Sequence, residues 1–319
     1  MKKIVLLDGK TLGGLDFSKL KEIGLFEYYD TTSPEEVISR IKDANIIITN
    51  KVVLNSKNLS QAKNLELICE TGTGYNNIDV KYAKENKIAV TNVAGYSTNS
   101  VAQHTFATVL NLYEKLSYYD EFIKSGKYSK SGIFTDLSIP FYELEGKTWG
   151  IIGLGAIGKK VAKIAESFGC KIVYYSTTGQ NNDSEYKRVE FEELLKSCDV
   201  ISIHAPLTEK TSGLMNYEAI SKMKKSAMLV NMGRGPIVVE ADLARAIEEE
   251  LIAGAALDVF EVEPIKADNP LLKIKNKENL ILTPHIAWAS IEARGRLLEE
   301  VTENIRAFYK GEIRSRVEL

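Results

Sequence analysis

The second half of the chain alternates short apolar runs with stretches of helical pattern, and this alternation restricts the folds that the chain can form. The apolar runs lie at residues 149–153, 171–175, 200–204, 228–232, 254–259 and 280–283, and the helical stretches include 157–168, 189–197 and 240–250. Strands that are apolar along their whole length are buried on both faces, as in parallel sheets covered by helices. The pattern therefore predicts a doubly wound α/β domain with a parallel sheet.

The first third of the chain carries a shorter series of the same kind. Its apolar runs lie at residues 4–8, 46–49, 65–69 and 88–91. They are bounded by Asn, Lys and Gly, and they predict buried parallel strands. A helix is expected over 34–42, because Ser33, Pro34 and Glu36 have the pattern of a helix N-terminus. A second, smaller α/β domain is predicted here.

The order of these segments predicts two domains, one of them discontinuous. A long helical stretch over 100–116 separates the two series, so we place the domain boundary just before it. The last helix, over 289–309, follows the final strand and is expected to return to the first domain. Residues 1–96 and 289–319 then form one domain, and residues 97–288 form a second domain inserted into it.

One segment after the long helix lacks a regular pattern. Residues 118–147 are rich in Tyr, Ser and Gly and contain Pro140. We expect irregular structure, and an irregular segment of this length is commonly functional or part of an interface. The segment is therefore the predicted contact of a homodimer.

The composition excludes several kinds of partner. The chain has 319 residues, a net charge of −2, a pI near 6.1 and no long basic run, so neither nucleic acid nor an acidic membrane surface is expected. No apolar stretch approaches the roughly 18 residues of a membrane span, and the N-terminal segment does not match a signal peptide, so a cytoplasmic location is expected. The three cysteines lack C-x-x-C spacing and the three histidines lie far apart, so no metal site is predicted.

A glycine-rich turn follows the apolar run at 149–153. Gly153, Gly155 and Gly158 have the spacing G-x-G-x-x-G and open a helical stretch. The first glycine permits a tight turn, the second lets the backbone approach a pyrophosphate, and the third allows close packing of the helix. The free N–H groups at a helix N-terminus favour an anion. The turn therefore predicts a dinucleotide-binding site of the Rossmann type.

The acidic residue that usually follows such a turn by about 20 positions, and that binds the ribose hydroxyls of NAD, is absent. Ser176 follows the run 171–175, and no arginine lies in that turn, since Lys187 and Arg188 come about ten residues later. Hydroxyl groups can bind ribose or phosphate, and they do not repel a 2′-phosphate. NAD is the predicted cofactor, with NADP or the use of both left open.

Three chemically reactive side chains each follow a predicted strand, where parallel sheets place their ligands. His285 carries an imidazole, which exchanges protons near neutral pH. Glu263 is suited to orient that imidazole, with Glu261 as the alternative. Arg234 lies between two glycines and can hold a carboxylate through two parallel hydrogen bonds. Together they predict an active site that moves a hydride and a proton.

The motifs around these residues resemble those of D-isomer-specific 2-hydroxyacid dehydrogenases over essentially the whole chain. The similar segments are Asn231-Met-Gly-Arg-Gly235, Ala256-Leu-Asp-Val259, Glu263-Pro264 and Thr283-Pro-His285. Residues 94–103 and 284–288 most resemble the glycerate dehydrogenase, or hydroxypyruvate reductase, branch. The resemblance implies an NAD(P)-binding Rossmann domain inserted into a flavodoxin-like substrate domain. It also implies NAD(P)H-dependent reduction of a small 2-keto acid, above all hydroxypyruvate to D-glycerate.

The resemblance implies roles for individual residues. His285 becomes the proton donor, Glu263 its partner, and Arg234 the group that binds the substrate carboxylate. The backbone amides of Thr73 and Gly74 are implied to bind the same carboxylate. The implied cofactor contacts are the three glycines with Ala156 and Ile157 at the pyrophosphate, Ser176 at the ribose, His204 and Pro206 at the adenosine, Met232 and Asp258 at the nicotinamide, and Trp288 beside His285. Core packing is the alternative for Trp288.

Two other functions stay open at this point. One is the reduction of another small 2-keto acid, such as glyoxylate or pyruvate. The other is an NAD(H)-sensing regulatory protein on the same fold, because a fold does not determine a function. A formate dehydrogenase is disfavoured, because its chemistry requires no proton donor and would leave Glu263 and His285 without a role.

Overall fold

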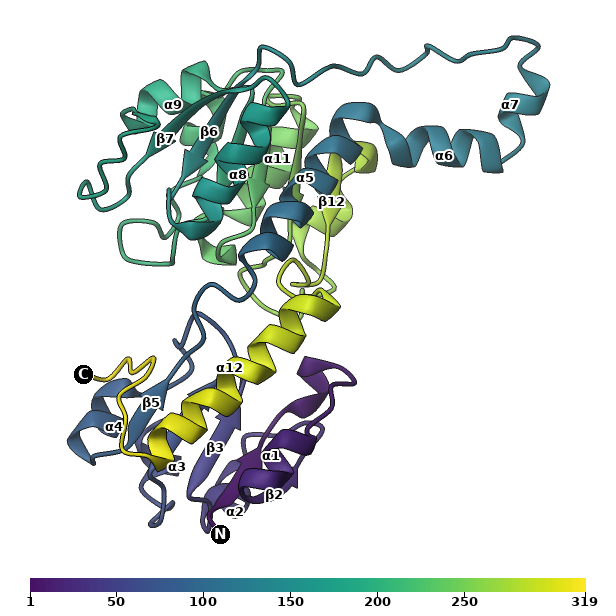
Figure 1. Cartoon of the computed structure of the whole chain (residues 1–319). Coiled ribbons are helices and arrows are strands. Elements are labelled where there is room, and N and C mark those ends of the chain that lie inside the picture. Colours follow the sequence, from purple (N-terminus) through teal and green to yellow (C-terminus); the bar gives the residue numbers. More distant parts are fainter. The chain divides into compact units, whose positions relative to one another are not determined.

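The computed structural model describes residues 1–319, which divide into two compact units. Unit 1 comprises Met1–Ser97 and Ala289–Leu319, and unit 2 comprises Thr98–Trp288. Each unit contains one parallel sheet flanked by helices (Figure 1). The predicted fold class, two doubly wound α/β domains with one inserted into the other, is confirmed.

Unit 1 has a five-stranded parallel sheet in the order β2-β1-β3-β4-β5, the order of flavodoxin-like folds. The strands are β1 (Lys3–Leu6), β2 (Leu25–Tyr28), β3 (Ile46–Thr49), β4 (Leu67–Glu70) and β5 (Ala89–Thr91). The helices are α1 (Ser18–Ile23), α2 (Val37–Ile41), α3 (Ser56–Leu59), α4 (Val80–Glu85) and α12 (Ile291–Tyr309). The long helix α12 packs against α1 and β4, so the last helix belongs to the same unit as the first strands.

Two details of unit 1 differ from the pattern in the sequence. The helix expected over 34–42 begins only at Val37, because Glu36 N donates to Ser33 O at 3.0 Å and closes a turn over residues 33–36 instead. Strand β2 was not predicted. It is one of the two edge strands of the sheet, and the side chain of Leu25 at its start is 60 % exposed, so it lacks a fully buried apolar run.

Unit 2 has a seven-stranded parallel sheet in the order β12-β11-β10-β9-β6-β7-β8. The strands are β6 (Thr148–Ile152), β7 (Lys171–Tyr175), β8 (Lys187–Arg188), β9 (Val200–Ile203), β10 (Met228–Asn231), β11 (Gly254–Leu257) and β12 (Leu280–Leu282). The order reverses between β6 and β9, and doubly wound sheets bind their ligands at such a switch point, beyond the carboxyl ends of the strands.

Helices cover both faces of this sheet, because alternate side chains of its central strands pack against different sets of helices. The helices are α5 (Thr98–Glu114), α6 (Leu116–Lys124), α7 (Lys127–Lys130), α8 (Ala156–Ser167), α9 (Phe191–Ser197), α10 (Tyr217–Ser221) and α11 (Glu240–Glu248). Along β10, Met228 and Val230 pack with α5 and α8, whereas Leu229 packs with α9, α10 and α11. Successive side chains of a strand point to opposite faces, so each face has its own core.

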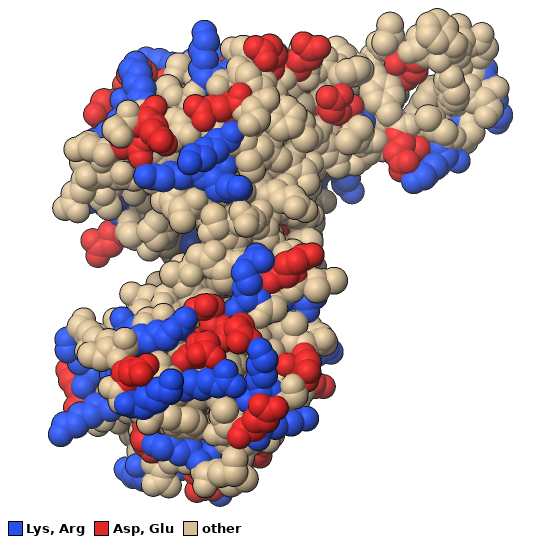
Figure 2. Space-filling view, viewed as in Figure 1, with Lys and Arg blue, Asp and Glu red and all other residues tan.

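The segment 118–147 is partly helical, so the prediction of irregular structure throughout was wrong. Helices α6 and α7 lie in it, and Figure 1 shows both away from the seven-stranded sheet. We call residues 116–143 the arm. The arm exposes large apolar side chains, with Phe134 90 % and Leu137 76 % exposed. In Figure 2 the visible arm surface is mostly uncharged, whereas acidic and basic side chains are interspersed over the rest of the face shown.

Two further properties bear on the sequence analysis. No helix combines the length and the apolar character needed to cross a membrane. Cys69, Cys170 and Cys198 are buried and unpaired, and burial raises the pKa of each thiol, so they act as small core residues.

Candidate active site

The glycine-rich turn lies at the carboxyl end of β6 and leads into α8. Gly153 has φ +93°, and a Cβ there would lie 2.7 Å from the Ala205 backbone nitrogen. A Cβ on Gly158 would lie 2.5 Å from the Gly153 carbonyl oxygen, whereas one on Gly155 would meet nothing within 4 Å. The first and third glycines are therefore required by packing, and the second leaves open space beside the backbone. No side chain caps the start of α8 at Gly155, so its first amides suit a pyrophosphate.

The turn after β7 is tied to this loop. Ser176 is buried, and its Oγ accepts a hydrogen bond from Asn181 N at 3.3 Å. The Asn181 side chain donates to Leu154 O, within the glycine turn, at 2.8 Å. Arg188 Nη1 donates to Gly179 O at 2.8 Å, so a guanidinium lies against the turn that Ser176 opens.

The position of Arg188 is a feature that sequence reasoning missed. Arg188 comes nine positions after Gly179, but β8 pairs with β7 and places Arg188 opposite Tyr174. A strand of only two residues leaves no detectable pattern in the sequence. At the ribose end of the predicted dinucleotide site, a cation thus lies against the turn that Ser176 opens, and the turn at 176–179 itself contains no carboxylate.

His204 and Pro206 follow β9. His204 Nε2 lies 3.1 Å from Ser202 Oγ, which accepts from Trp149 Nε1 at 2.9 Å. Ser202 has one hydrogen to donate, so the network is satisfied when His204 Nε2 accepts it and Nδ1 carries the imidazole proton. Burial lowers the pKa of His204 to about 3, so the ring is neutral. Its Nδ1 is buried and has no partner in the chain, which fits a position facing a bound group.

Arg234 follows β10 on a loop that only glycine can form. A Cβ on Gly235 would lie 1.9 Å from Phe260 backbone atoms, and one on Gly233 would lie 2.8 Å from Ala205 O. The Asn231 amide holds the loop, accepting from Gly233 N at 3.0 Å and donating to Arg234 O at 2.9 Å. The half-buried guanidinium of Arg234 donates to a backbone carbonyl and forms no ion pair, so it can bind an anionic ligand.

His285 and Glu263 are in direct contact. His285 Nδ1 lies 2.7 Å from Glu263 Oε2, and the two side chains are 23 % and 33 % exposed. Phe260 N donates to the other carboxylate oxygen at 3.1 Å, which fixes Glu263. Glu261, the alternative partner, is exposed and contacts Glu240 through its backbone N–H. Because the carboxylate accepts from Nδ1, His285 Nε2 is the nitrogen left to exchange a proton with a ligand.

Asp258 supports the loop that carries His285. Its carboxylate is 1 % exposed and accepts from Ile286 N at 2.9 Å, Ala287 N at 2.8 Å and Thr283 Oγ1 at 2.6 Å. Three donors occupy three of the four lone-pair positions of a carboxylate. One position on Oδ2 is left for a further donor.

The comparisons agree with this geometry. The family model described as "D-isomer specific 2-hydroxyacid dehydrogenase, NAD binding domain" matches residues 106–287. The chain belongs to the D-isomer-specific 2-hydroxyacid dehydrogenase family. It is 41 % identical to a hydroxypyruvate reductase of Blautia hydrogenotrophica over 97 % of both chains. It is 37 % identical to a glycerate dehydrogenase of Methylorubrum extorquens over 99 % of both.

A solved structure gives the same assignment. The NADPH-dependent glyoxylate/hydroxypyruvate reductase of Sinorhizobium meliloti, in complex with citrate, superposes with a TM-score of 0.84 at 26 % identity, covering 99 % of this chain and 98 % of that one. The predicted family and branch are confirmed. The protein is an NAD(P)-dependent oxidoreductase that acts on the CH–OH group of 2-hydroxy acids.

The remaining predicted residues of the dehydrogenase lie in varied surroundings. Met232 is buried, and Pro206 is exposed on the loop after His204. Trp288 is half-buried and packs against the core between α5 and the sheet. Thr73 and Gly74 belong to unit 1, where the loop after β4 leaves their backbone N–H groups without hydrogen bonds in the chain. Their place beside Arg234 and His285 stays a prediction.

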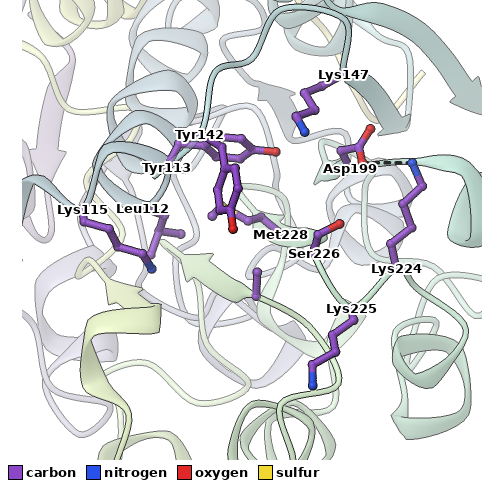
Figure 3. Close-up of a pocket in the computed structure, with 11 residues that line it drawn as sticks. Leu112, Tyr113, Lys115, Tyr142, Lys147, Asp199, Lys224, Lys225, Ser226 and Met228 are labelled. Carbon is purple, nitrogen blue, oxygen red and sulfur yellow. Dashed lines mark hydrogen bonds and ion pairs between the residues drawn. The ribbon is translucent and has the colours of Figure 1, made fainter. Parts of the chain in front are cut away.

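A cavity of the dehydrogenase's unit 2 lies away from these loops (Figure 3). It measures about 560 Å³ and is bordered by residues at the amino ends of β6, β9, β10 and β11, the opposite edge of the sheet from the glycine turn. Its ammonium groups do not converge on one point. Lys224 pairs with Asp199 at 2.9 Å (Figure 3). Lys115 donates to Asn279 at 2.9 Å. The cavity is therefore separate from the candidate site.

Proposed function

We propose that this dehydrogenase reduces hydroxypyruvate to D-glycerate, with His285 as the proton donor. The contact between His285 and Glu263 carries the proposal, because it leaves one imidazole nitrogen free to exchange a proton. The substrate is suggested by relatives named hydroxypyruvate reductase and glycerate dehydrogenase, which match almost the whole chain. Glyoxylate is the second candidate, because several relatives are named glyoxylate reductases.

The residues of the chain divide the work of the reaction. Arg234 binds the substrate carboxylate with its unpaired guanidinium. For the amides of Thr73 and Gly74, which have no hydrogen bonds in the chain, the family resemblance implies the same ligand. His285, in its cationic form with a proton on each nitrogen, donates the Nε2 proton to the carbonyl oxygen, and Glu263, which accepts from Nδ1–H, stabilises and orients that cationic ring. A bound nicotinamide supplies the hydride that the carbonyl carbon receives.

The nicotinamide cofactor is proposed to lie along the carboxyl ends of β6, β7 and β9–β11. Gly153, Gly155 and Gly158 with the amides of Ala156 and Ile157 would hold its pyrophosphate, and Ser176 would face its ribose. His204 Nδ1, Pro206, Met232, Asp258 and Trp288 complete the proposed contacts. NAD is the proposed cofactor, and NADP is accepted as well, because Arg188 adds positive charge where NAD-specific turns place a carboxylate.

We also propose that the enzyme is a homodimer joined through the arm. Its exposed aromatic and aliphatic side chains form an apolar surface that a monomer would leave in water. We further propose that the enzyme is cytoplasmic, that its substrate is a small molecule, and that it has no nucleic-acid or membrane partner.

The proposed function is tested by NADH and NADPH oxidation with hydroxypyruvate, glyoxylate and pyruvate. We expect hydroxypyruvate to have the highest kcat/KM, and His285→Ala to lower kcat about 10²- to 10⁴-fold, the usual contribution of a general acid. Cofactor affinity, followed by fluorescence titration, should stay within about twofold of the wild type, since His285 only donates a proton.

A pair of variants on one loop serves as the matched control. Glu263→Gln removes the carboxylate that orients His285, whereas Glu261→Gln changes an exposed neighbour. Only the first should lower kcat. Full activity of His285→Ala would refute its role, and cofactor binding without turnover of any keto acid would favour the regulatory alternative.

A further inference from the structure

Helix α5 is fastened to the loop that carries His285 through two side chains on one face. Ser100 Oγ donates to Ala287 O at 2.6 Å, and His104 Nε2 lies 3.0 Å from Thr283 Oγ1. Residues four positions apart in a helix lie on the same side, so both contacts come from one face of α5. They reach the loop on either side of His285.

The hydrogen bond between His104 and Thr283 has a defined direction. Thr283 Oγ1 donates its single hydrogen to Asp258 Oδ1 at 2.6 Å, because a buried carboxylate can only accept. The hydroxyl must then accept from His104, so His104 Nε2 carries a proton. His104 Nε2 also lies 3.7 Å from Asp258 Oδ1. The imidazole thus stabilises the orientation in which the Thr283 hydroxyl donates to Asp258.

Asp258, held by Thr283, in turn binds the backbone beside the proposed proton donor. Its carboxylate accepts from the N–H groups of Ile286 and Ala287, the two residues after His285. His285 itself has φ +54°, a left-handed conformation that residues other than glycine rarely adopt. Such a conformation persists only where its surroundings determine it.

We propose that His104 is a positioning residue, which acts through Thr283 and Asp258 to hold residues 283–287 and thereby keep His285 against Glu263. This inference rests on the proposed role of His285 in the reaction. His104 does not contact His285 in the structure, and its effect passes through a hydrogen-bond chain of four residues that ends in the backbone of Ile286. A well-held imidazole lies in line with its acceptor, and a displacement of about 1 Å can cost a hundredfold in rate.

The test compares substitutions that remove or retain the donor. His104→Leu removes the N–H that Thr283 accepts, whereas His104→Gln places an amide N–H near the same position. Thr283→Val breaks the chain at its next member while keeping the shape of the side chain. Gln103→Leu is the matched control, because Gln103 is exposed on the adjacent position of α5 and takes no part in the network.

Two readouts are measured on the full-length protein. Turnover of hydroxypyruvate should fall about tenfold or more in His104→Leu and Thr283→Val, mainly in kcat, and recover to within about threefold in His104→Gln. Imidazole NMR of the cofactor-free protein follows His285 directly, since the chain has only three histidines. The Nδ1–H of His285 should exchange with solvent about tenfold faster in the two disruptive variants, and at the wild-type rate in Gln103→Leu.

The two readouts separate this inference from the proposed function. Unchanged Nδ1–H exchange in both disruptive variants would overturn the positioning role, whatever the turnover. Faster exchange in a protein that turns over no 2-keto acid would support the positioning role and refute the proposed function. The effects of His104→Leu and Thr283→Val must also be non-additive in the double variant, and additive effects would contradict a single chain.

Discussion

Three histidines in this chain occupy three environments, and each environment restricts what the imidazole can do. His285 is partly exposed and paired with a carboxylate, which leaves its other nitrogen free. His104 lies on α5, faces the loop after β12 and donates to a hydroxyl. His204 has a buried nitrogen and no charged neighbour in contact, so it is held neutral. Only His285 has a carboxylate at hydrogen-bond distance from Nδ1, the pairing that orients an imidazole for proton transfer.

The state of His204 predicts a specific loss of stability in acid. Its pKa in the folded protein is about 3, against 6.5 as the ordinary value. Between these values the unfolded chain binds more protons, so the free energy of unfolding falls as the pH drops from about 6.5 towards 3. His204→Gln removes this contribution. From pH 7.5 to 4.5 the wild type should lose at least about 1 kcal/mol more than the variant, because a tenfold change in proton affinity is worth about 1.4 kcal/mol.

Urea denaturation of the two proteins at both pH values measures this difference. The variant is expected to be less stable at pH 7.5, because Ser202 and Trp149 lose part of their network. Its stability must nevertheless depend less on pH. Parallel pH dependences in the two proteins would show that the ring is not held neutral by the fold.

At the scale of elements, the sequence predicts strands that carry an apolar run, including the edge strands β5 and β12, and misses the edge strands that lack one. Strands β6, β9, β10 and β11 are apolar because both of their faces are covered, and their runs predicted them within about two residues. The edge strands β2 and β8 carry no such run. The short helices α3 and α10 are four and five residues long, too short for a periodic pattern.

The candidate site shows the same division. The sequence placed Arg234, Glu263 and His285 after successive strands, because the carboxyl ends of parallel strands lie at one edge of a sheet. Whether Glu261 or Glu263 contacts His285 depends on the path of the loop that carries them. The local sequence does not predict that path. The same holds for Arg188, whose place depends on which strand β8 pairs with.

The turn after β7 predicts how the cofactor preference can be changed. Ser176→Asp introduces a carboxylate at the proposed ribose position, where it repels a 2′-phosphate and can accept from the ribose hydroxyls of NADH. We expect kcat/KM for NADPH to fall about tenfold or more and that for NADH to hold or rise. Steady-state assays with both cofactors measure the ratio.

Arg188→Ala is the companion variant, because it removes the positive charge and leaves the turn neutral. It should weaken the use of NADPH and leave that of NADH within about threefold. Arg188→Lys keeps a cation but loses the planar group that bonds Gly179 O, so an intermediate value is expected. Equal effects on the two cofactors in all three variants would place the 2′-position of the ribose elsewhere.

At the scale of the whole molecule, the chain passes between the two units twice, and unit 2 anchors both passages. It leaves unit 1 after Ser97 and returns to it at Ala289. Ser100 and Ala287 stand beside these points and are joined by a hydrogen bond of 2.6 Å within unit 2. The proposed proton donor at 285 thus lies on a segment that is fixed immediately before the chain re-enters unit 1.

The arm predicts the state of assembly. Its segment between α7 and β6 carries Phe134 and Leu137 almost fully exposed, without a covering element in the chain. Burying side chains of this size contributes about 1.5–3 kcal/mol each, which suits an interface with a second copy. Replacing both with Asp should turn a dimer into a monomer, because two charges would enter an apolar contact. Light scattering after gel filtration measures the mass directly.

The control must be equally exposed and lie outside the arm. Ile313, 75 % exposed near the C-terminus, meets this condition, so Ile313→Asp should leave the dimer intact. A wild-type monomer at micromolar concentration would contradict the proposal outright. A dimer that survives both arm substitutions would assign its interface to another surface, and the apolar arm would then require a different partner.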